Sequence, residues 1–455
     1  METSHYWQNL GAAPALLSAL PFAGLILLIA VLPFFPGASA WWEQHRNKFK
    51  LALVCALLGI LAYFIPTGDW ERIGITYLEY AAFIVMLLAL FVISGGIHIS
   101  GAFAGFPRSN TAFLAIGAAL ASLLGTTGAS MVMIRPLLRS NRQRRHKAHI
   151  VIFFIFTVSN CGGLLTPLGD PPLYLGFLRG VPFDWTLRLT PQWLLVNFLL
   201  LLVFYILDAW YFRREEDHMP ATLTNEIKQA KRKIHIQGWR NVLFLLLMMS
   251  VILASGYFIY PALARGRGEL AAEIGSKLIQ IILMGLLAYG SYRLTPARIH
   301  HENEFNFAPI REVAILFFGI FGAMIPALAL LEAKCALLGL QKPWHYFWLS
   351  GTLSGFLDNA PTYLVYTTLA ASQNNLSASH LGALASQFPA LLAAISCGTV
   401  FMGAMTYIGN GPNFMVKAIA EHARVKMPSF GGYMLWSIAI LIPVLILQTL
   451  VFFRT

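Results

Sequence analysis

The sequence predicts an all-α polytopic membrane protein made of two inverted repeats, and three observations support this prediction. First, 57% of the 455 residues are hydrophobic and only 11% are charged, whereas soluble domains carry about 25% charged residues. Second, the chain contains ten apolar segments, each near or above the roughly 20 residues that a spanning helix needs. Third, each half of the chain carries a matching helix interruption.

The ten apolar segments form two sets of five. The first set is 14–36, 50–65, 76–99, 148–178 and 191–212, and the second is 241–261, 272–293, 309–333, 388–420 and 432–453. Two further apolar regions, 111–138 and 344–372, carry polar residues at mid-length, in 125–130 and 357–362. Each region could be a single span or a re-entrant hairpin that dips into the bilayer and returns.

Basic residues decide between these options. With two hairpins and an outside N-terminus, the inner loops hold 21 Lys and Arg and the outer loops hold 8, as the positive-inside rule requires. A single span at 111–138 would instead put the basic loops 139–147 and 213–240 outside. We therefore expect two hairpins. The halves, 1–213 and 239–455, then have opposite orientations, with a cytoplasmic linker at 214–238 between them.

The same loop charges account for the formal net charge of +12, so nucleic acid is not an expected partner. Membrane lipid is. We expect a multi-pass location in a cell membrane, that of the bacterial cytoplasm. The four cysteines and twelve histidines show no metal-ligand spacing. The sequence also lacks a nucleotide-binding loop and a nucleophile motif, so neither an enzyme nor a resident cofactor is expected.

The interruptions lie in segments 148–178 and 388–420. Gly169-Asp-Pro-Pro172 breaks the first and Gly409-Asn-Gly-Pro412 breaks the second, because proline lacks an amide donor and glycine costs backbone entropy. Unwound backbone at membrane depth survives only where it is buried in protein or lines a wet cavity. Paired breaks of this kind are typical of a transporter's binding site.

Asp358, at the tip of the second hairpin, is the first candidate ligand. A carboxylate at membrane depth costs about 2.5–3.5 kcal/mol on insertion scales, and Asn359 follows it. Hard cations favour carboxylate, amide and hydroxyl oxygens, so Asp358 and Asn359 form a candidate sodium site. The alternative is that Asp358 caps the second half-helix, and one side chain can do both.

Further oxygen ligands lie at the other tip and at the breaks. Thr126 and Thr127 occupy the first tip, where a small-residue helix interface is the alternative. Asp170 in the first break matches Asn410 in the second, and a partly desolvated carboxylate there can exchange protons near neutral pH. Asp170 could instead cap the half-helix 171–178. The remaining candidate oxygen ligands are Asn160, Thr166, Thr406 and Asn413.

Several charged and polar residues have two interpretations. Arg135 and Lys417 follow the first tip and the second break, where each could bind an anion, neutralise an empty site or snorkel to the inner interface. Glu79 and Glu312 lie near the starts of corresponding spans, and we expect them to cap a helix or lie at the interface. Ser109-Asn110-Thr111 begins the first hairpin and does not form its tip.

At these residues the chain resembles the ion transporter superfamily. The most specific stretches are Leu357-Asp-Asn-Ala-Pro361, Asn160-Cys-Gly-Gly-Leu-Leu-Thr-Pro-Leu-Gly-Asp170 and Phe305-Asn-Phe-Ala-Pro-Ile-Arg-Glu-Val-Ala-Ile-Leu-Phe-Phe-Gly-Ile320. They look most like the NhaD-type sodium/proton antiporter branch and a related group of citrate transporters. The resemblance implies inverted repeats of five spans, sites at tips and breaks, and often a homodimer with elevator-like motion.

One departure favours a cation over a dicarboxylate as substrate. Dicarboxylate symporters of the superfamily have Ser-Asn-Thr at both tips, whereas this chain has Gly-Thr-Thr-Gly and Asp-Asn-Ala-Pro. The first hypothesis is therefore a sodium/proton antiporter in which Na⁺ and H⁺ compete for Asp358 and Asp170. The second is a carrier of citrate or another organic anion coupled to Na⁺ or H⁺. A receptor without transport is the third, and the buried acids argue against it.

Overall fold

The computed structural model describes residues 17–32, 41–42, 44–102, 105–216, 232–334, 339–378 and 380–454. Within them, eight helices are long and apolar enough to cross a membrane. Two of the ten expected spans are missing from this set for simple reasons: segment 14–36 is only partly described, as α3 (Leu20–Val31), and segment 388–420 is broken. The protein is thus an all-α, multi-pass membrane protein, as the sequence predicts.

The first half contains three long helices, a broken helix pair and an interrupted helix. The long helices are α5 (His45–Thr67), α6 (Trp70–Gly95) and α11 (Thr190–Glu216). Helices α7 (Pro107–Leu124) and α8 (Thr126–Ser140) pack side by side and meet at Gly125, whose φ of +74° suits glycine. The interrupted helix consists of α9 (Ala148–Thr157), the 3₁₀ turn η2 (Cys161–Leu165) and α10 (Pro171–Leu178).

The second half repeats this order of elements. Its first span is divided by a π turn, η4 (Ser255–Ile259), into α13 (Arg240–Ala254) and α14 (Tyr260–Arg267). Helices α15 (Glu269–Leu294), the short α16 (Ala297–Glu302) and α17 (Ala308–Lys334) follow. The broken pair is α18 (Pro343–Phe356) and α19 (Asn359–Gln373), and a short helix, α20 (Gly382–Gln387), comes next.

The interrupted helix of the second half is α21 (Pro389–Met402), η6 (Gly403–Met405) and α22 (Gly411–His422). A second π turn, η7 (Ser437–Leu441), divides the last span into α23 (Phe430–Trp436) and α24 (Ile442–Phe452). The two interrupted helices are therefore broken where the Gly-Pro sequences predict. The α7–α8 pair and the α18–α19 pair are each divided at the predicted polar tip.

A small sheet departs from the all-helical expectation. Strand β1 (His98–Ala102) pairs antiparallel with β2 (Arg232–Gln237), and Ile99 lies opposite Ile236. The second strand belongs to the expected linker 214–238, of which residues 217–231 lie outside the described part of the chain. The sheet joins the end of this linker to the loop that leads into α7.

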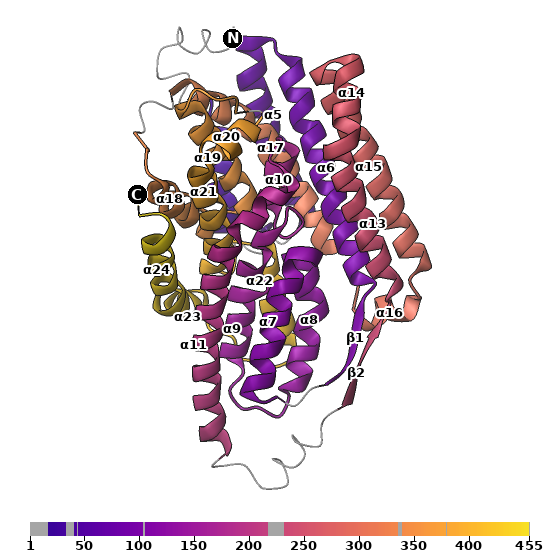
Figure 1. Cartoon of the computed structure of the whole chain (residues 1–455), viewed down its shortest axis with the longest axis vertical. Coiled ribbons are helices and arrows are strands. Elements are labelled where there is room, and N and C mark those ends of the chain that lie inside the picture. Colours follow the sequence, from indigo (N-terminus) through magenta and orange to yellow (C-terminus); the bar gives the residue numbers. More distant parts are fainter. Residues whose placement is uncertain are drawn as a thin grey trace.

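The helices of the two halves interleave. In Figure 1, α6, α13, α14 and α15 lie along one side, and α18, α21 and α24 lie on the opposite side. Helix α5 packs on α17, and α6 packs on α15. Likewise α8 packs on α22, and α10 packs on α19. Each of these pairs joins a helix of the first half to one of the second, so the core lies between the halves.

Burial differs strongly among the spanning helices. The most apolar windows of α6, α9–η2 and α17 are 61%, 89% and 72% buried, whereas the other five are 22–28% buried. Apolar side chains on those five helices, such as Phe198 and Leu286, are left exposed, as a lipid-facing surface requires. Helices α6 and α17 and the first part of the interrupted helix, α9–η2, thus lie inside, and the other five spanning helices face lipid.

A buried polar network stabilises the end of the α7–α8 pair that lies opposite its tip. Asp208 on α11 accepts hydrogen bonds from Arg144 (2.8 Å) and Asn110 (2.9 Å), and it pairs with His149 (2.8 Å). Arg144 also donates to Glu215 (2.8 Å). Asn110, the centre of the Ser109-Asn110-Thr111 sequence, therefore has a structural role at the base of the helix pair, far along α7 from its tip.

Candidate functional site

Asp170 lies at the break between η2 and α10, directly before Pro171 and Pro172. It occupies the N-cap position of α10, but its side chain makes no capping hydrogen bond. A capping side chain accepts an N–H at the second or third helical position. Pro172 has no N–H at the second, and the Leu173 N–H at the third donates to the Asp170 backbone carbonyl (3.1 Å). The alternative in which the Asp170 carboxylate caps this half-helix is therefore wrong, and the carboxylate is available to other segments.

Three segments donate hydrogen bonds to this carboxylate. Thr126 Oγ1, at the first tip, lies 2.9 Å from Oδ1, and Asn359 Nδ2, at the second tip, lies 2.7 Å from Oδ2. Asn410 Nδ2, in the second break, lies 3.1 Å from Oδ1. Both tips and both breaks thus meet at one buried carboxylate, and two of its three donors come from the second half.

Two more asparagines extend this arrangement. Asn410 Nδ2 also lies 3.1 Å from Asn160 Oδ1, and Asn160 Nδ2 donates to Asn413 Oδ1 over 2.7 Å. All these side chains are buried. We call the set the Asp170 cluster, and its members are Asp170, Thr126, Asn160, Asn359, Asn410 and Asn413.

The cluster has one formal charge and neutral partners. Among the described residues, no ion pair includes Asp170. Its donors are a hydroxyl and two amides. A buried carboxylate without a counter-charge is costly, so a bound cation or a proton would lower the free energy of this site. The surrounding carbonyl and hydroxyl oxygens are the ligand types that a hard cation takes.

Thr166 and Thr406, also expected at the site, tie each break to its own hairpin. Thr166 Oγ1 donates to the Ser122 carbonyl, and Thr406 Oγ1 donates to the Gly355 carbonyl over 2.6 Å. Ser354 Oγ donates to Asn359 Oδ1 (2.6 Å) and so orients that amide. Neither Ser354 nor Ser122 is among the candidate residues that the sequence predicts.

Asp358 and Thr127 lie beside the cluster without joining it. The Asp358 side chain accepts the Ala360 N–H (3.1 Å) and caps α19, so the capping interpretation of Asp358 is confirmed. Thr127 lines a cavity of about 70 Å³, together with Thr126, Leu168 and Gly169. Helices α6 and α17 close the other side of this cavity, which has room for several water molecules.

Close backbone approaches shape both breaks. A Cβ atom on Gly169 would lie 2.0 Å from the Gly163 carbonyl oxygen, and one on Gly409 would lie 2.5 Å from the Gly403 carbonyl oxygen. No side chain fits at either distance. The two glycines therefore hold the chain in matching bends that bring Asp170 and Asn410 together.

The structure gives the two basic candidates acidic partners of their own. Arg135 Nη2 pairs with Glu304 over 2.7 Å, and Lys417 Nζ pairs with Glu421 over 2.9 Å. Neither is brought to Asp170. Of the cysteines, Cys55, Cys161 and Cys397 are free and buried, and Cys335 lies outside the described residues. The described residues contain no group of three metal-ligating side chains.

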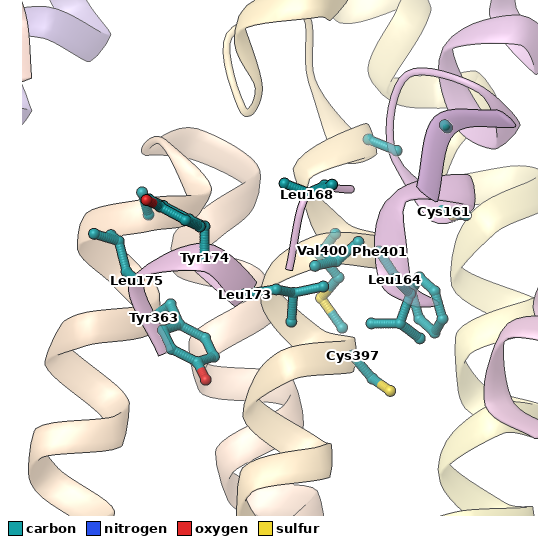
Figure 2. Close-up of a cluster of buried hydrophobic side chains, with 14 of the residues drawn as sticks. Cys161, Leu164, Leu168, Leu173, Tyr174, Leu175, Tyr363, Cys397, Val400 and Phe401 are labelled. Atoms are coloured by element: carbon teal, nitrogen blue, oxygen red, sulfur yellow. The ribbon is translucent and has the colours of Figure 1, made fainter. Parts of the chain in front are cut away.

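Apolar side chains surround the first break. Figure 2 shows Leu164 and Leu168 next to Val400 and Phe401 of α21, with Tyr363 of α19 close to Leu175. These side chains are buried. This packing keeps bulk water from that side of the break. The cavity beside Thr127 is lined by Gly169 and Pro171, the two neighbours of Asp170 in the chain.

A multi-pass helical fold with two interrupted helices around a buried carboxylate is typical of membrane transport proteins. A family model described as "Putative citrate transport" matches residues 11–453, nearly the whole chain. The chain therefore belongs to this citrate transport family. The match supports the citrate branch of the resemblance and gives no support to the NhaD-type branch in particular. No curated protein matches the sequence.

Proposed function

We propose that this protein is a secondary carrier that moves citrate or a similar carboxylate together with a cation, and that Asp170 binds the cation. The family match supports the carboxylate. The observation that carries the coupling is a buried carboxylate, without an ionic partner among the described residues, bound by Thr126, Asn359 and Asn410. Na⁺ or H⁺ would supply the missing positive charge.

The proposal assigns the two halves the roles of inverted repeats. Residues 1–213 and 239–455 are the repeats, each with a re-entrant hairpin, and 214–238 is the cytoplasmic linker. The exchange of partners between halves supports this, since α6 packs on α15 while α5 packs on α17. A homodimer in a bacterial cytoplasmic membrane, which the resemblance implies, belongs to the same proposal.

Sodium/proton antiport is the second candidate. It is favoured by the same buried carboxylate of Asp170, which has no ionic partner among the described residues. It is also favoured by Asp358, a second acid that directly precedes Asn359. In that case Na⁺ would bind at Asp358 and Asn359, Thr127 would contribute its hydroxyl, and H⁺ would replace Na⁺ at the carboxylates. Arg135 and Lys417 are candidates for anion binding only in the carboxylate carrier, after release from Glu304 and Glu421.

Flux measurements in proteoliposomes test the proposal. We expect uptake of labelled citrate driven by an inward Na⁺ or H⁺ gradient, and at least a tenfold loss of this driven uptake in Asp170→Asn. Proton movement that depends on Na⁺ or Li⁺ without citrate would favour antiport instead. The exposed Asp184 gives a matched control, because Asp184→Asn removes one charge outside the cluster.

A charge-swapped variant sharpens this test. Asp170→Asn combined with Asn410→Asp moves the carboxylate to the matching position of the other half, 240 residues along the chain and 3.1 Å away. We expect the double variant to recover part of the cation coupling that Asp170→Asn loses. Full coupled transport in Asp170→Asn alone would contradict the role given to this residue.

A further inference from the structure

A second buried charge cluster lies outside the site. Glu79 on α6 receives Arg179 Nη2 at 3.2 Å and Lys277 Nζ at 3.4 Å. All three residues are buried, although Glu79 was expected to cap a helix or lie at the interface. Glu79 does not cap α6, since Asp69 does, and the two cations allow the Glu79 carboxylate to be buried. Lys277 also pairs with Glu273, one turn away on α15 (2.6 Å).

Half of this cluster has a counterpart in the other half of the chain. Glu312 on α17 forms an ion pair with Lys48 on α5, just as Glu79 on α6 does with Lys277 on α15. Each pair joins two helices that pack along one another. The two Glu–Lys ion pairs thus connect the helices of one group, which consists of α5, α6, α15 and α17.

Arg179 is the member of the Glu79 cluster that has no counterpart in the second half of the chain. It ends α10, the short helix that begins directly after Asp170. The offset of 240 residues that relates Asp170 to Asn410 leads from Arg179 to Ile419, which carries no charge. The interrupted helix of the first half is therefore connected to α6 by an ion pair. The matching position of the second half has no such pair.

We infer that Arg179 is a releasable latch, which holds α10, and Asp170 with it, against α6 in the conformation described here. The inference rests on the proposed carrier function, in which the helices around Asp170 move relative to the α5, α6, α15 and α17 group. A carrier with one such latch is held more firmly in one of its two end states than in the other.

The charges around Glu79 make release feasible. When Arg179 leaves, Glu79 keeps Lys277, so the carboxylate is not left buried without a counter-charge. Arg179 itself lies at the end of α10, next to Gly180 with φ +86°, and a long guanidinium side chain can extend to water from a helix end. If Arg179 were the single partner of Glu79, its release would leave the Glu79 carboxylate buried without a counter-charge and would cost more free energy.

Reversible cross-linking tests the latch directly. In a chain whose four native cysteines are replaced, Glu79→Cys with Arg179→Cys is joined by a short, reducible thiol cross-linker. We expect at least a tenfold loss of citrate or ion flux after cross-linking, and recovery after reduction. The control is Lys48→Cys with Glu312→Cys, which joins α5 to α17, and we expect its flux to be unchanged. Undiminished flux in the cross-linked 79–179 chain would overturn the latch.

Hydrogen exchange gives a readout that does not need transport. We expect Arg179→Gln to speed amide exchange in α10 and in the facing turn of α6 by about tenfold, and the exposed Arg188→Gln to leave both unchanged. Unchanged exchange in Arg179→Gln would also overturn the latch. If the cysteine-free parent moves neither citrate nor cations, the proposed function fails, and hydrogen exchange still decides whether Arg179 holds α10 to α6.

Discussion

At the scale of single residues, the two acids that the sequence singles out have different surroundings. Asp170 is followed by two prolines and has no capping bond, so its carboxylate meets donors from three other segments. Asp358 is followed by Asn359 and Ala360, which both have N–H groups, and its carboxylate caps α19. The two acids thus differ at the second helical position, where Ala360 offers Asp358 an N–H and Pro172 offers Asp170 none.

Two substitutions separate the capping role of Asp358 from its proposed cation binding. Asn caps a helix about as well as Asp, whereas Ala loses about 0.5–2 kcal/mol. We expect Asp358→Asn to keep the thermal unfolding midpoint and Asp358→Ala to lower it. If Asp358 also binds Na⁺, both should raise the Na⁺ concentration for half-maximal flux by about tenfold, or about 1.4 kcal/mol. An unchanged Na⁺ dependence in Asp358→Asn would leave Asp358 as a cap alone.

Sequence reasoning identified the members of the Asp170 cluster but not their partners. Polar residues in apolar segments are visible in the sequence, and Thr126, Asn359 and Asn410 were selected for that reason. Which side chain faces which depends on helix packing between the halves. The sequence predicts Asp358 and Asn359 together as a sodium site and Asp170 as a second acid, while the structure brings Asn359 to Asp170.

At the scale of elements, the two interrupted helices depend on glycines that no other residue can replace. Ala at position 409 would place a Cβ 2.5 Å from the Gly403 carbonyl oxygen, whereas a Cβ on Gly411 would meet nothing within 4 Å. Overpacking of this kind costs about 1–3 kcal/mol. The break is thus fixed by backbone contact and by the Gly-Pro sequence together.

This contrast gives a test with a matched control two residues away. We expect Gly409→Ala to lower the thermal unfolding midpoint of the purified protein and to reduce transport, because the bend that carries Asn410 must open. Gly411→Ala should leave both unchanged. Equal stability of the two variants would show that the approach of Gly409 to Gly403 does not fix the bend.

The element boundaries were largely predictable, and the exceptions have physical causes. Gly-Pro sequences and polar tips marked both breaks and both helix pairs. The π turns at Ser255–Ile259 and Ser437–Leu441 were not predicted, although a proline follows each of them two residues later. Pro261 and Pro443 remove an amide donor from the helix and so favour an irregular turn before them. The β1–β2 pairing was also unforeseen, because it joins two segments far apart in the chain.

At the scale of the whole molecule, loop charge predicts which side of the membrane each end of the fold faces. Arg145 lies in the basic loop 139–147, and Ser386 lies in the uncharged loop 373–387; both side chains are exposed. We expect a membrane-impermeant maleimide to label Ser386→Cys in intact cells and Arg145→Cys only in inverted vesicles. Labelling of Arg145→Cys from outside would reverse the proposed orientation.

The Asp170 cluster also bears on how the protein is made. Asn359 follows Asp170 by 189 residues, which at 5–20 residues per second takes roughly 10–40 seconds of synthesis. During that interval the first half must enter the membrane with its central acid lacking two of its three partners. A nascent chain stalled before Asn359 would therefore hold an acid that only water or a proton can satisfy, and quality-control proteases should distinguish it from the finished carrier.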